Sequence, residues 1–325
     1  MVAIIIPTLN RIIHLKRCVE SLQRNTYASE VDLYISVDFP PDKKYYNGYE
    51  DVCEYVKTIR GFRSTKYYYQ NDNLGPNKNT FFLEKCVEND GINEIIYTED
   101  DNEFSPNFIE FCVKGLEKFR NIPEIIAVCG WSNISSGYDR DSYCALPYKL
   151  PYGYGYWLSK QKLIREYLNN EYWESVLFDN KKLIKMFLIN KRAFWTYAQD
   201  TKRYIHAMRD DDDNLLEIDW VGDVLIALNG WRAVYPVIRQ CRNHGFDGSG
   251  VNASKEEDTD DLFMDIDTNC HFNYTNQLTD EQCKKEWRRI KKTLDPGAKE
   301  MIKAILYIVI EKIKKHKDNR TNYEA

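Results

Sequence analysis

Three carboxylates stand side by side at Glu99, Asp100 and Asp101, directly after the apolar segment of residues 94–98. Adjacent carboxylates repel one another and are costly to desolvate near a core, so water or a positive charge must accompany them. Carboxylate oxygens are the hard ligands that Mg²⁺ and Mn²⁺ prefer, and such ions share their shell with substrate phosphates. The position after a predicted strand therefore indicates a cation and diphosphate site, although a solvated acidic loop is the alternative.

A second acidic run, the four aspartates at positions 210 to 213, is a rival cation site. It follows a basic stretch with helical periodicity, and no strand fixes the geometry of its side chains. We therefore interpret it as a solvated loop.

The elements that must position residues 99–101 are indicated by alternating apolar and amphipathic segments. Strands are expected at residues 2–6, 31–37, 66–70, 94–98 and 124–130, with helices between them. Asn10 is a candidate cap for the helix after the first strand, and Ser105 with Pro106 is expected to begin the helix after the carboxylates. This alternation favours an α/β fold with a mostly parallel, doubly wound sheet.

Polar residues follow several of these predicted strands. They are Asn10, Asp38, Asn73 and the three carboxylates. Open α/β sheets bind ligands beyond the carboxyl ends of their strands, so these side chains are expected to share one site. The sequence contains neither a GxGxxG motif after the first strand nor a GxxxxGK[ST] motif, so neither a dinucleotide site nor a P-loop site is indicated.

The second half of the chain differs from the first in composition and in its predicted elements. Residues 147–157 are expected to form a Gly/Tyr loop, residues 161–208 to be helical, and residues 251–280 to be acidic and irregular. From residue 298 an amphipathic helix is predicted. Its apolar positions are Met301, Ile302, Ile305, Leu306, Ile308, Val309 and Ile313. Two interpretations stay open: the helix packs on the domain, or it lies on an anionic bilayer surface.

Composition narrows the class of protein. Of the 325 residues 43% are apolar, which is typical of a globular chain, and the net charge of −5 argues against a nucleic-acid partner. The nine cysteines form no CxxC pair and are expected to be reduced. We find neither a signal peptide nor a membrane-spanning segment, so we expect a cytoplasmic protein, with peripheral attachment to the inner face of the membrane as one extension.

Six segments occur in the order found in GT-A glycosyltransferases: VAIIIPTLNR, LYISVDFP, DNLGPNKNTFFLEKC, IIYTEDDNEFSPNFIEF, VCGWSN and PYGYGYWLSK. The chain resembles bacterial family 2 enzymes, from residue 2 to about residue 252. Its Glu-Asp-Asp segment also resembles that of the α-mannosyl-glycoprotein N-acetylglucosaminyltransferase that begins complex N-glycans. The resemblance implies a GT-A domain at 1–252, with a nucleotide-binding half (1–130) and an acceptor and catalytic half (131–252). An acidic loop and amphipathic helices would follow at 253–325.

The resemblance also implies roles for the residues after the first strands. Pro7, Thr8, Asn10 and Arg11 would line the nucleotide pocket, and Asn73 and Lys78 would border the ribose and phosphates. Asp38 would accept a hydrogen bond from the base, expected to be uracil, although a turn-forming role is as well supported by the sequence. Asp101 would ligate Mn²⁺ or Mg²⁺, while Glu99 and Asp100 would contact the nucleotide-sugar.

Residues of the second half would complete the site. By the same resemblance, Asp219 beside Trp220 would be the general base, with Asp223 one turn later as the alternative; both are otherwise ordinary residues near a helix start. Tyr154 or Trp157 would lie near the donor sugar. Three further residues could reach the diphosphate or the metal: Arg239, Arg242 and His244, the last also explained as a loop histidine.

The expected activity is metal-dependent, inverting transfer from UDP-GlcNAc, UDP-GalNAc or UDP-Gal to a glycan or lipid-linked acceptor. Bacterial surface polysaccharide synthesis, such as that of capsule or lipopolysaccharide, is the expected setting. Two alternatives are a nucleotidyltransferase that makes sugar nucleotides and a non-catalytic glycan-binding protein of the same fold. The first would usually carry a Gly-rich basic loop after strand one, which PTLNR lacks, and the second would be favoured by loss of Asp101 and Asp219.

Overall fold

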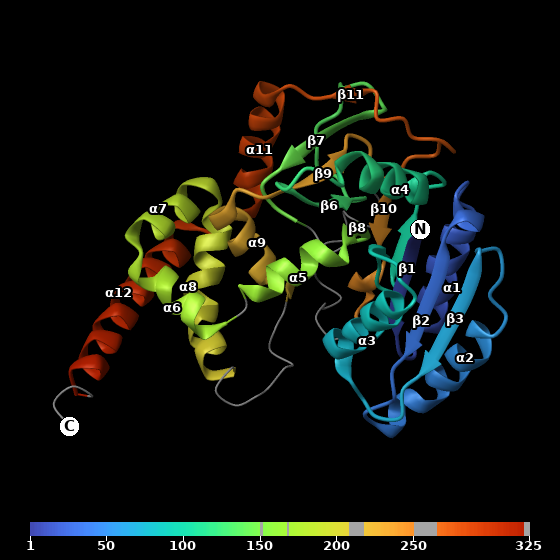
Figure 1. Cartoon of the computed structure of the whole chain (residues 1–325), viewed down its shortest axis with the longest axis horizontal. Coiled ribbons are helices and arrows are strands. Elements are labelled where there is room, and N and C mark those ends of the chain that lie inside the picture. The colour runs from blue at the N-terminus through green and yellow to red at the C-terminus, as the bar shows by residue number, and fades with distance from the viewer. Residues whose placement is uncertain (150–151, 168, 208–217, 250–264, 322–325) are drawn as a thin grey trace. The chain divides into compact units, whose positions relative to one another are not determined.

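The computed structural model describes residues 1–149, 152–167, 169–207, 218–249 and 265–321 (Figure 1). The chain separates into two units. The first comprises Met1–Leu146, Leu150–Gln161 and Ala233–Glu286, and the second comprises Pro147–Lys149, Lys162–Arg232 and Trp287–Ala325. These units are defined by how compactly the chain packs and not by function. The functional boundaries predicted at residues 130 and 252 therefore stay predictions.

The first unit contains a sheet in which nine strands pair among the described residues, in the order β11-β7-β9-β6-β8-β4-β1-β2-β3. Four neighbours are parallel: β1 (Val2–Thr8), β2 (Asp32–Val37), β3 (Ser64–Tyr69) and β4 (Glu94–Tyr97). β1 and β2 are buried along almost their whole length, as continuous apolar strands with both faces covered should be. This parallel half confirms the predicted α/β class.

The other half of the sheet is mixed. β8 (Tyr154–Trp157) runs antiparallel to both β4 and β6 (Ile125–Cys129). β7 (Ser142–Leu146) is antiparallel to β9 (Arg232–Pro236) and parallel to β11 (Asn276–Gln277). A separate two-stranded sheet joins β5 (Asn102–Phe104) to β10 (Cys241–Asn243). Residues 147–157 are thus not a loop throughout, because their last four residues form β8.

Helices flank the parallel strands of the first unit (Figure 1). They are α1 (Ile12–Gln23), α2 (Tyr46–Val56), α3 (Gly75–Asn89) and α4 (Phe108–Phe119), with short 3₁₀ turns η1 (Ala28–Glu30), η2 (Lys43–Tyr45) and η4 (Gly245–Asp247). One face of α1 and of α4 joins the apolar core formed with β1 and β2. Two predicted helix starts are wrong: Arg11, not Asn10, is the N-cap of α1, and α4 begins at Phe108 after Asn107.

The second unit is helical. Its members are α6 (Asn170–Phe178), α7 (Asn180–Ile189), α8 (Lys191–Ala207), α9 (Ile218–Asn229) and α12 (Ala298–Thr321). Two helices, α5 (Leu158–Glu166) and α11 (Asp280–Leu294), pass from one unit into the other. Among the described residues no helix is both long enough and apolar enough to cross a bilayer.

All nine cysteines lie in the described part of the chain and are free. Five of the nine are buried as small apolar side chains, namely Cys18, Cys112, Cys129, Cys144 and Cys241, whereas Cys53, Cys86 and Cys283 are half-buried and Cys270 is exposed. The expectation of reduced thiols is consistent with this arrangement.

Candidate functional site

The carboxyl ends of β1, β2 and β4 meet at one edge of the parallel sheet. The Asp38 N–H donates to the Thr8 carbonyl at 2.8 Å, and the Thr98 N–H donates to the Ile5 carbonyl at 3.2 Å. These backbone bonds continue the β1–β2 and β1–β4 pairing past the last strand residues. The edge therefore collects the segment after β1, Asp38 after β2 and the carboxylates after β4.

Asp100 and Asp101 are both buried and share one cation, the guanidinium of Arg11. Arg11 Nη2 pairs with Asp100 Oδ1 and lies 2.9 Å from Asp101 Oδ2. The Thr8 hydroxyl donates to Asp100 Oδ2 at 2.7 Å. A positive charge beside the adjacent carboxylates is thus supplied by Arg11, the residue directly before α1.

The pKa values of Asp100 and Arg11 each depend on the charge of the other residue. Burial is the largest influence on Asp100 and raises its pKa; the Arg11 charge opposes this and the neighbouring Asp101 charge adds to it. For Arg11, burial alone would lower the pKa, but the charges of Asp100 and Asp101 outweigh burial and raise it. Arg11 therefore stays protonated while it is held between the two carboxylates.

Asp101 is also held from the side of β10. Asn243 donates its side-chain amide to Asp101 Oδ1 at 2.9 Å and to Asn102 Oδ1 at 3.0 Å. The His244 N–H donates to the Asp101 carbonyl at 2.8 Å, and the Gly245 N–H donates to Asn243 Oδ1 at 2.8 Å. The RNHG segment thus fixes Asp101, and Asn243 is a site residue that the sequence interpretation missed.

The His244 side chain has a different partner from its backbone. Its Nε2 lies 2.8 Å from Glu103 Oε2, and this contact is the main reason that the pKa of Glu103 lies below its usual value. Arg242 Nε lies 4.0 Å from the same Glu103 oxygen. His14 lies nearby, with Nε2 3.1 Å from Asp247 Oδ2. Positive Arg242 and negative Glu103 and Asp247 thus place charges of both signs around Asp101.

Asp38 is buried and accepts hydrogen bonds from the start of α3. The N–H groups of Leu74 and Gly75 donate to its two carboxylate oxygens at 2.8 and 2.9 Å. The Asn73 amide lies 3.3 Å from Asp38 Oδ2 and donates to the Phe39 carbonyl at 2.7 Å. Burial is the largest influence and raises the pKa of Asp38, although these backbone donors oppose it. Asp38 and Asn73 therefore form one network that anchors the N-terminus of α3 at the sheet edge.

The other first-half candidates also lie on elements at this edge. Pro7 is paired with Ser36 in the β1–β2 ladder, and Lys78 lies near the start of α3. Gly48 of α2 packs on the Asn10 backbone, because a Cβ at Gly48 would be 2.3 Å from the Asn10 oxygen. The half-buried Glu99 accepts from the Tyr97 hydroxyl at 3.3 Å.

Trp157 is a predicted donor-site residue that the fold does not bring to the carboxylates. Trp157 is buried and pairs with Glu94 at the beginning of β4, whereas the carboxylates follow the end of that strand. Tyr154 pairs with Tyr97 and so lies at the carboxylate edge. The Arg239 guanidinium is buried 3.7 Å from the centre of the Trp131 ring, where its Nε donates to the Ser132 carbonyl.

The two candidate general bases belong to α9 in the second unit. Asp223 is buried, and its Oδ1 accepts from the Lys149 N–H at 3.2 Å. Asp219 is in the first turn of α9, and its side chain lies outside the described residues, as do the four aspartates at positions 210 to 213. The base role of either aspartate stays a prediction.

The carboxylates fit a divalent cation by the chemistry of their donors. Asp100 and Asp101 offer hard oxygens at a strand end, and a Mg²⁺ or Mn²⁺ ion needs only one or two of them when a diphosphate completes its shell. Arg11 now supplies the countercharge, so an ion would share or displace this guanidinium. Within the described ranges no group of three or more His, Cys, Asp or Glu residues could hold a metal by itself.

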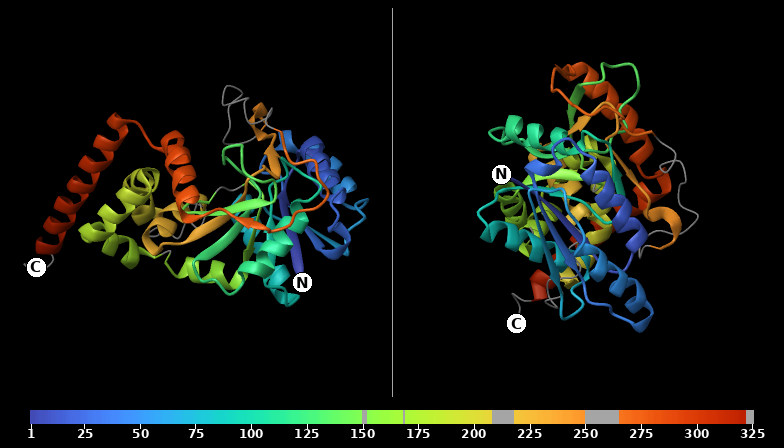
Figure 2. Two further views of the ribbon diagram at one scale, coloured as in Figure 1. Left: turned by 90° about the horizontal axis from the view of Figure 1, so that it is seen from above. Right: turned by 90° about the vertical axis from the view of Figure 1, so that its right-hand side faces the viewer.

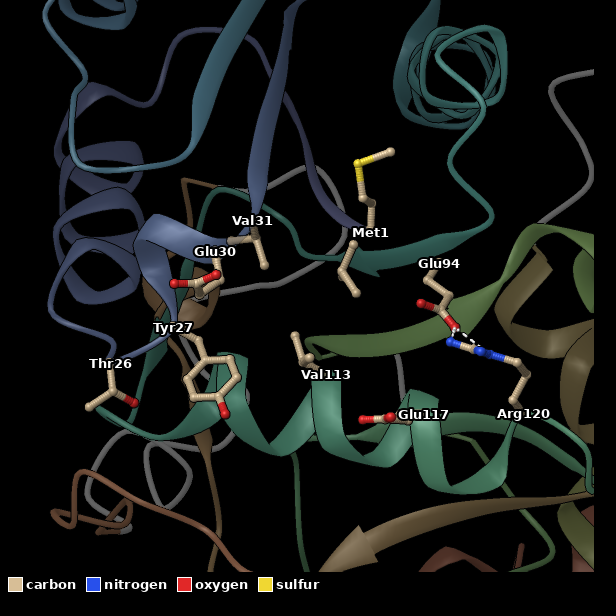
Figure 3. A pocket seen from close by; sticks show the side chains of 10 residues that line it. Met1, Thr26, Tyr27, Glu30, Val31, Glu94, Val113, Glu117 and Arg120 are labelled. Carbon is tan, nitrogen blue, oxygen red and sulfur yellow. Dashed lines mark hydrogen bonds and ion pairs between the residues drawn. The ribbon is translucent and has the colours of Figure 1, made fainter.

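A surface hollow of about 500 Å³ lies at the opposite edge of the same sheet (Figure 3). Its lining includes Met1 at the start of β1, Tyr27, and Glu94 at the start of β4, whose carboxylate accepts from Arg120 at 2.8 Å. Strand beginnings, not strand ends, line this hollow. It therefore shares no residue with the carboxylate edge.

Gly245 is predicted to be intolerant of any side chain. A Cβ at this position would be 2.4 Å from Asp101 Oδ2 and 3.1 Å from Asn243 Oδ1. We expect Gly245→Ala to lower the free energy of unfolding by about 1–3 kcal/mol, as overpacking does, and to weaken ligand binding at Asp101. Chemical denaturation would measure the first effect. Gly297→Ala is the control, because no atom lies within 4 Å of its Cβ; equal stability of the two variants would contradict the packing argument.

Asp38→Ala is predicted to destabilise the protein through α3. The change leaves the Leu74 and Gly75 N–H groups without their acceptors, which should cost about 1–3 kcal/mol in urea denaturation. Asp42→Ala is a matched control, because Asp42 caps η2 at an exposed position. If Asp38→Ala were as stable as this control, the anchoring role of Asp38 would be refuted.

The sequence matches no protein-family model, and no curated protein sequence matches it either. Solved structures with a similar arrangement include TarS 1-349 of S. aureus in complex with UDP, at 13% identity and a TM-score of 0.32 over 42% of this chain and 37% of that one. A mannosyltransferase of Pyrobaculum calidifontis, PcManGT, in complex with GDP-Man and Mn²⁺, has 12% identity and a TM-score of 0.35, covering 52% and 46% of the two chains.

A further structure of TarS 1-349 covers 70% of this chain and 80% of its own, at 12% identity and a TM-score of 0.37. Because every one of these TM-scores is below 0.5, the likenesses carry no argument about the activity of this chain. The chain spans less than half of the first TarS chain and of the mannosyltransferase that it matches.

Proposed function

We propose that this protein is a metal-dependent, inverting GT-A glycosyltransferase that uses a UDP-sugar. The observation that supports this most strongly is the buried pair Asp100 and Asp101, held with Arg11 and Thr8 at the carboxyl ends of β1 and β4. Such a cluster is costly to bury and is not needed to hold the sheet, whose strands pair without it. Charge concentrated beyond the strand ends suits a diphosphate and its cation.

The nucleotide half of the donor would lie between β2 and α3. Asp38 would accept from the uracil N3–H, with Asn73 beside it and Lys78 near the phosphates. The N-terminus of α3 begins at Gly75 within this network, and helix N-termini favour anions. The opposite wall of the nucleotide pocket would be formed by the segment that contains Pro7, Thr8, Asn10 and Arg11.

Asp101 would hold the cation, while Thr8 and Arg11 keep Asp100 in place. A bound Mn²⁺ or Mg²⁺ supplies positive charge that stabilises the departing diphosphate. Asn243 would orient the Asp101 carboxylate through its hydrogen bond to Oδ1. Arg242 and His244 would add positive charge at this side, with Glu103 setting their positions.

Asp219 would act as the general base, with Asp223 as the alternative. The acceptor hydroxyl oxygen attacks the anomeric carbon, the carboxylate takes its proton, and the bond to the UDP oxygen breaks with inversion. Asp223 already accepts a backbone hydrogen bond from Lys149, which favours a structural role for it. This contact supports Asp219 as the better candidate.

The donor sugar is proposed to be GlcNAc, GalNAc or Gal, and the acceptor a glycan or a lipid-linked oligosaccharide in bacterial surface polysaccharide synthesis. The test is release of the nucleoside diphosphate, UDP or GDP, from a panel of UDP-sugars and GDP-Man, with and without Mn²⁺. A glycosyltransferase releases UDP with one donor, and release stops when EDTA removes the metal. Formation of pyrophosphate from UTP and a sugar phosphate would instead indicate a nucleotidyltransferase, and glycan binding without turnover would indicate a binding protein.

A further inference from the structure

Helix α12 has two apolar faces, only one of which is covered within the second unit. Met301, Ala304 and Ile308 recur at helical spacing and are buried, and the helix packs against α8 and α6. Figure 2 shows α12 lying along α6 to α8. This face needs no further partner.

A second apolar stripe lies on the opposite side of α12. Its six members are each 45–59% exposed, namely Ile302, Ile305, Leu306, Val309, Ile310 and Ile313. The spacing of three and four residues places them in one continuous row along the helix. A contiguous row of six exposed aliphatic side chains is unusual on a soluble surface and marks a contact with another apolar phase.

Lysines border this stripe on both sides. Helical spacing puts Lys299, Lys303 and Lys314 along one border and Lys312 along the other. Lys303 and Lys314 are 61% and 60% exposed, and each pairs with a glutamate three residues earlier on its own helix. Those glutamates, Glu300 and Glu311, lie toward the covered face, so no acidic side chain of described residues 298–315 borders the stripe.

We propose that the stripe lies in the interface of an anionic lipid bilayer, with the helix axis parallel to the membrane surface. Aliphatic side chains would enter the acyl boundary, and the bordering lysines would reach the lipid phosphates. The charge supports this partner: residues 280–325 carry 13 Lys and Arg against 8 Asp and Glu, in a chain whose net charge is −5.

A second copy of the chain is a poorer occupant. A two-fold contact through the stripe would bring the lysine borders of both copies together with no carboxylate between them, and like charges across a contact are unfavourable. The proposal goes beyond the glycosyl-transfer activity, because it names a surface for this unit and requires no sugar nucleotide.

The test is co-sedimentation of the full chain with vesicles of phosphatidylglycerol and phosphatidylcholine in equal parts, and with vesicles of phosphatidylcholine alone. We expect binding to the anionic vesicles to be at least about tenfold tighter and to weaken as salt is added. Leu306→Ser/Val309→Ser should weaken it by about tenfold or more. Ile122→Ser/Leu163→Ser, two aliphatic residues of similar exposure elsewhere, should bind as the native chain does.

Circular dichroism would check that both double variants stay folded, and light scattering would report oligomeric state. The proposal is overturned if the native chain sediments equally with both vesicle types, or if the Leu306 and Val309 changes leave binding unaltered. A third outcome would also overturn it: the native chain is a dimer, the Leu306 and Val309 changes convert it to a monomer, and vesicle binding is unaltered. A second copy would then cover the stripe.

Discussion

Replacing Asp101 with asparagine should lower the affinity for UDP in the presence of Mn²⁺ by at least about 10²-fold. The variant keeps the size of the side chain and its ability to accept from Asn243, but it removes the charge that would hold the cation. Isothermal titration with UDP, with and without Mn²⁺, measures this directly. UDP affinity without metal should differ little between the two proteins.

Glu117→Gln is the matched control for this experiment. Glu117 lies in the hollow at the opposite edge of the sheet, so loss of its charge should leave Mn²⁺-dependent affinity unchanged. If Asp101→Asn bound UDP and Mn²⁺ as the native protein does, another group would have to hold the metal. If both variants lost affinity equally, the effect would be one of net charge and not of the carboxylate edge.

Asp219→Asn should lower turnover by about 10²-fold or more while UDP affinity stays within about twofold of the native value. The loss is large because the acceptor hydroxyl is a poor nucleophile unless a base takes its proton. Initial rates of UDP release at saturating donor and acceptor, together with titration of UDP, separate the two effects.

Asp223→Asn is the paired variant, four residues later in α9. Because Asp223 is buried and accepts from the Lys149 N–H, its replacement is expected to lower stability more than it lowers turnover per folded molecule. The opposite pattern, with Asp219→Asn fully active and Asp223→Asn inactive but stable, would transfer the base role to Asp223.

The parallel half of the sheet could be predicted because its signals are local. Apolar runs at residues 2–6 and 31–37 form strands buried on both faces, and the residues after them lie at one edge. Electrostatics also predicted that water or a positive charge must accompany Asp100 and Asp101. That Arg11 would supply this charge could not be predicted, because the pairing joins positions 89 and 90 residues apart.

Features that depend on distant partners could not be predicted. The segment YGYW resembles loop sequence in composition, yet it is β8, since β4 and β6 both supply hydrogen bonds to it. The register then decides that Tyr154, and not Trp157, lies at the carboxylate edge. Asn243 carries no motif of its own, and only the pairing of β5 with β10 brings it to Asp101.

The predicted caps failed for a similar reason. Asn10 and Ser105 are good capping residues by type, but Arg11 is the N-cap of α1, and the Ser105 hydroxyl has tertiary partners. The Ser105 hydroxyl donates within a buried network with Asn107 and Gln240, and α4 begins three residues later. Local propensity placed both helices correctly and misplaced only their first residues.

A crystal structure of the protein soaked with UDP and Mn²⁺ would show whether the carboxylate edge is the donor site. We expect a metal ion at Asp101 that also contacts the diphosphate, with the uracil ring beside Asp38 at the start of α3. UDP found only in the hollow at the opposite edge, or a metal ion bound without any contact to Asp100 or Asp101, would contradict this expectation.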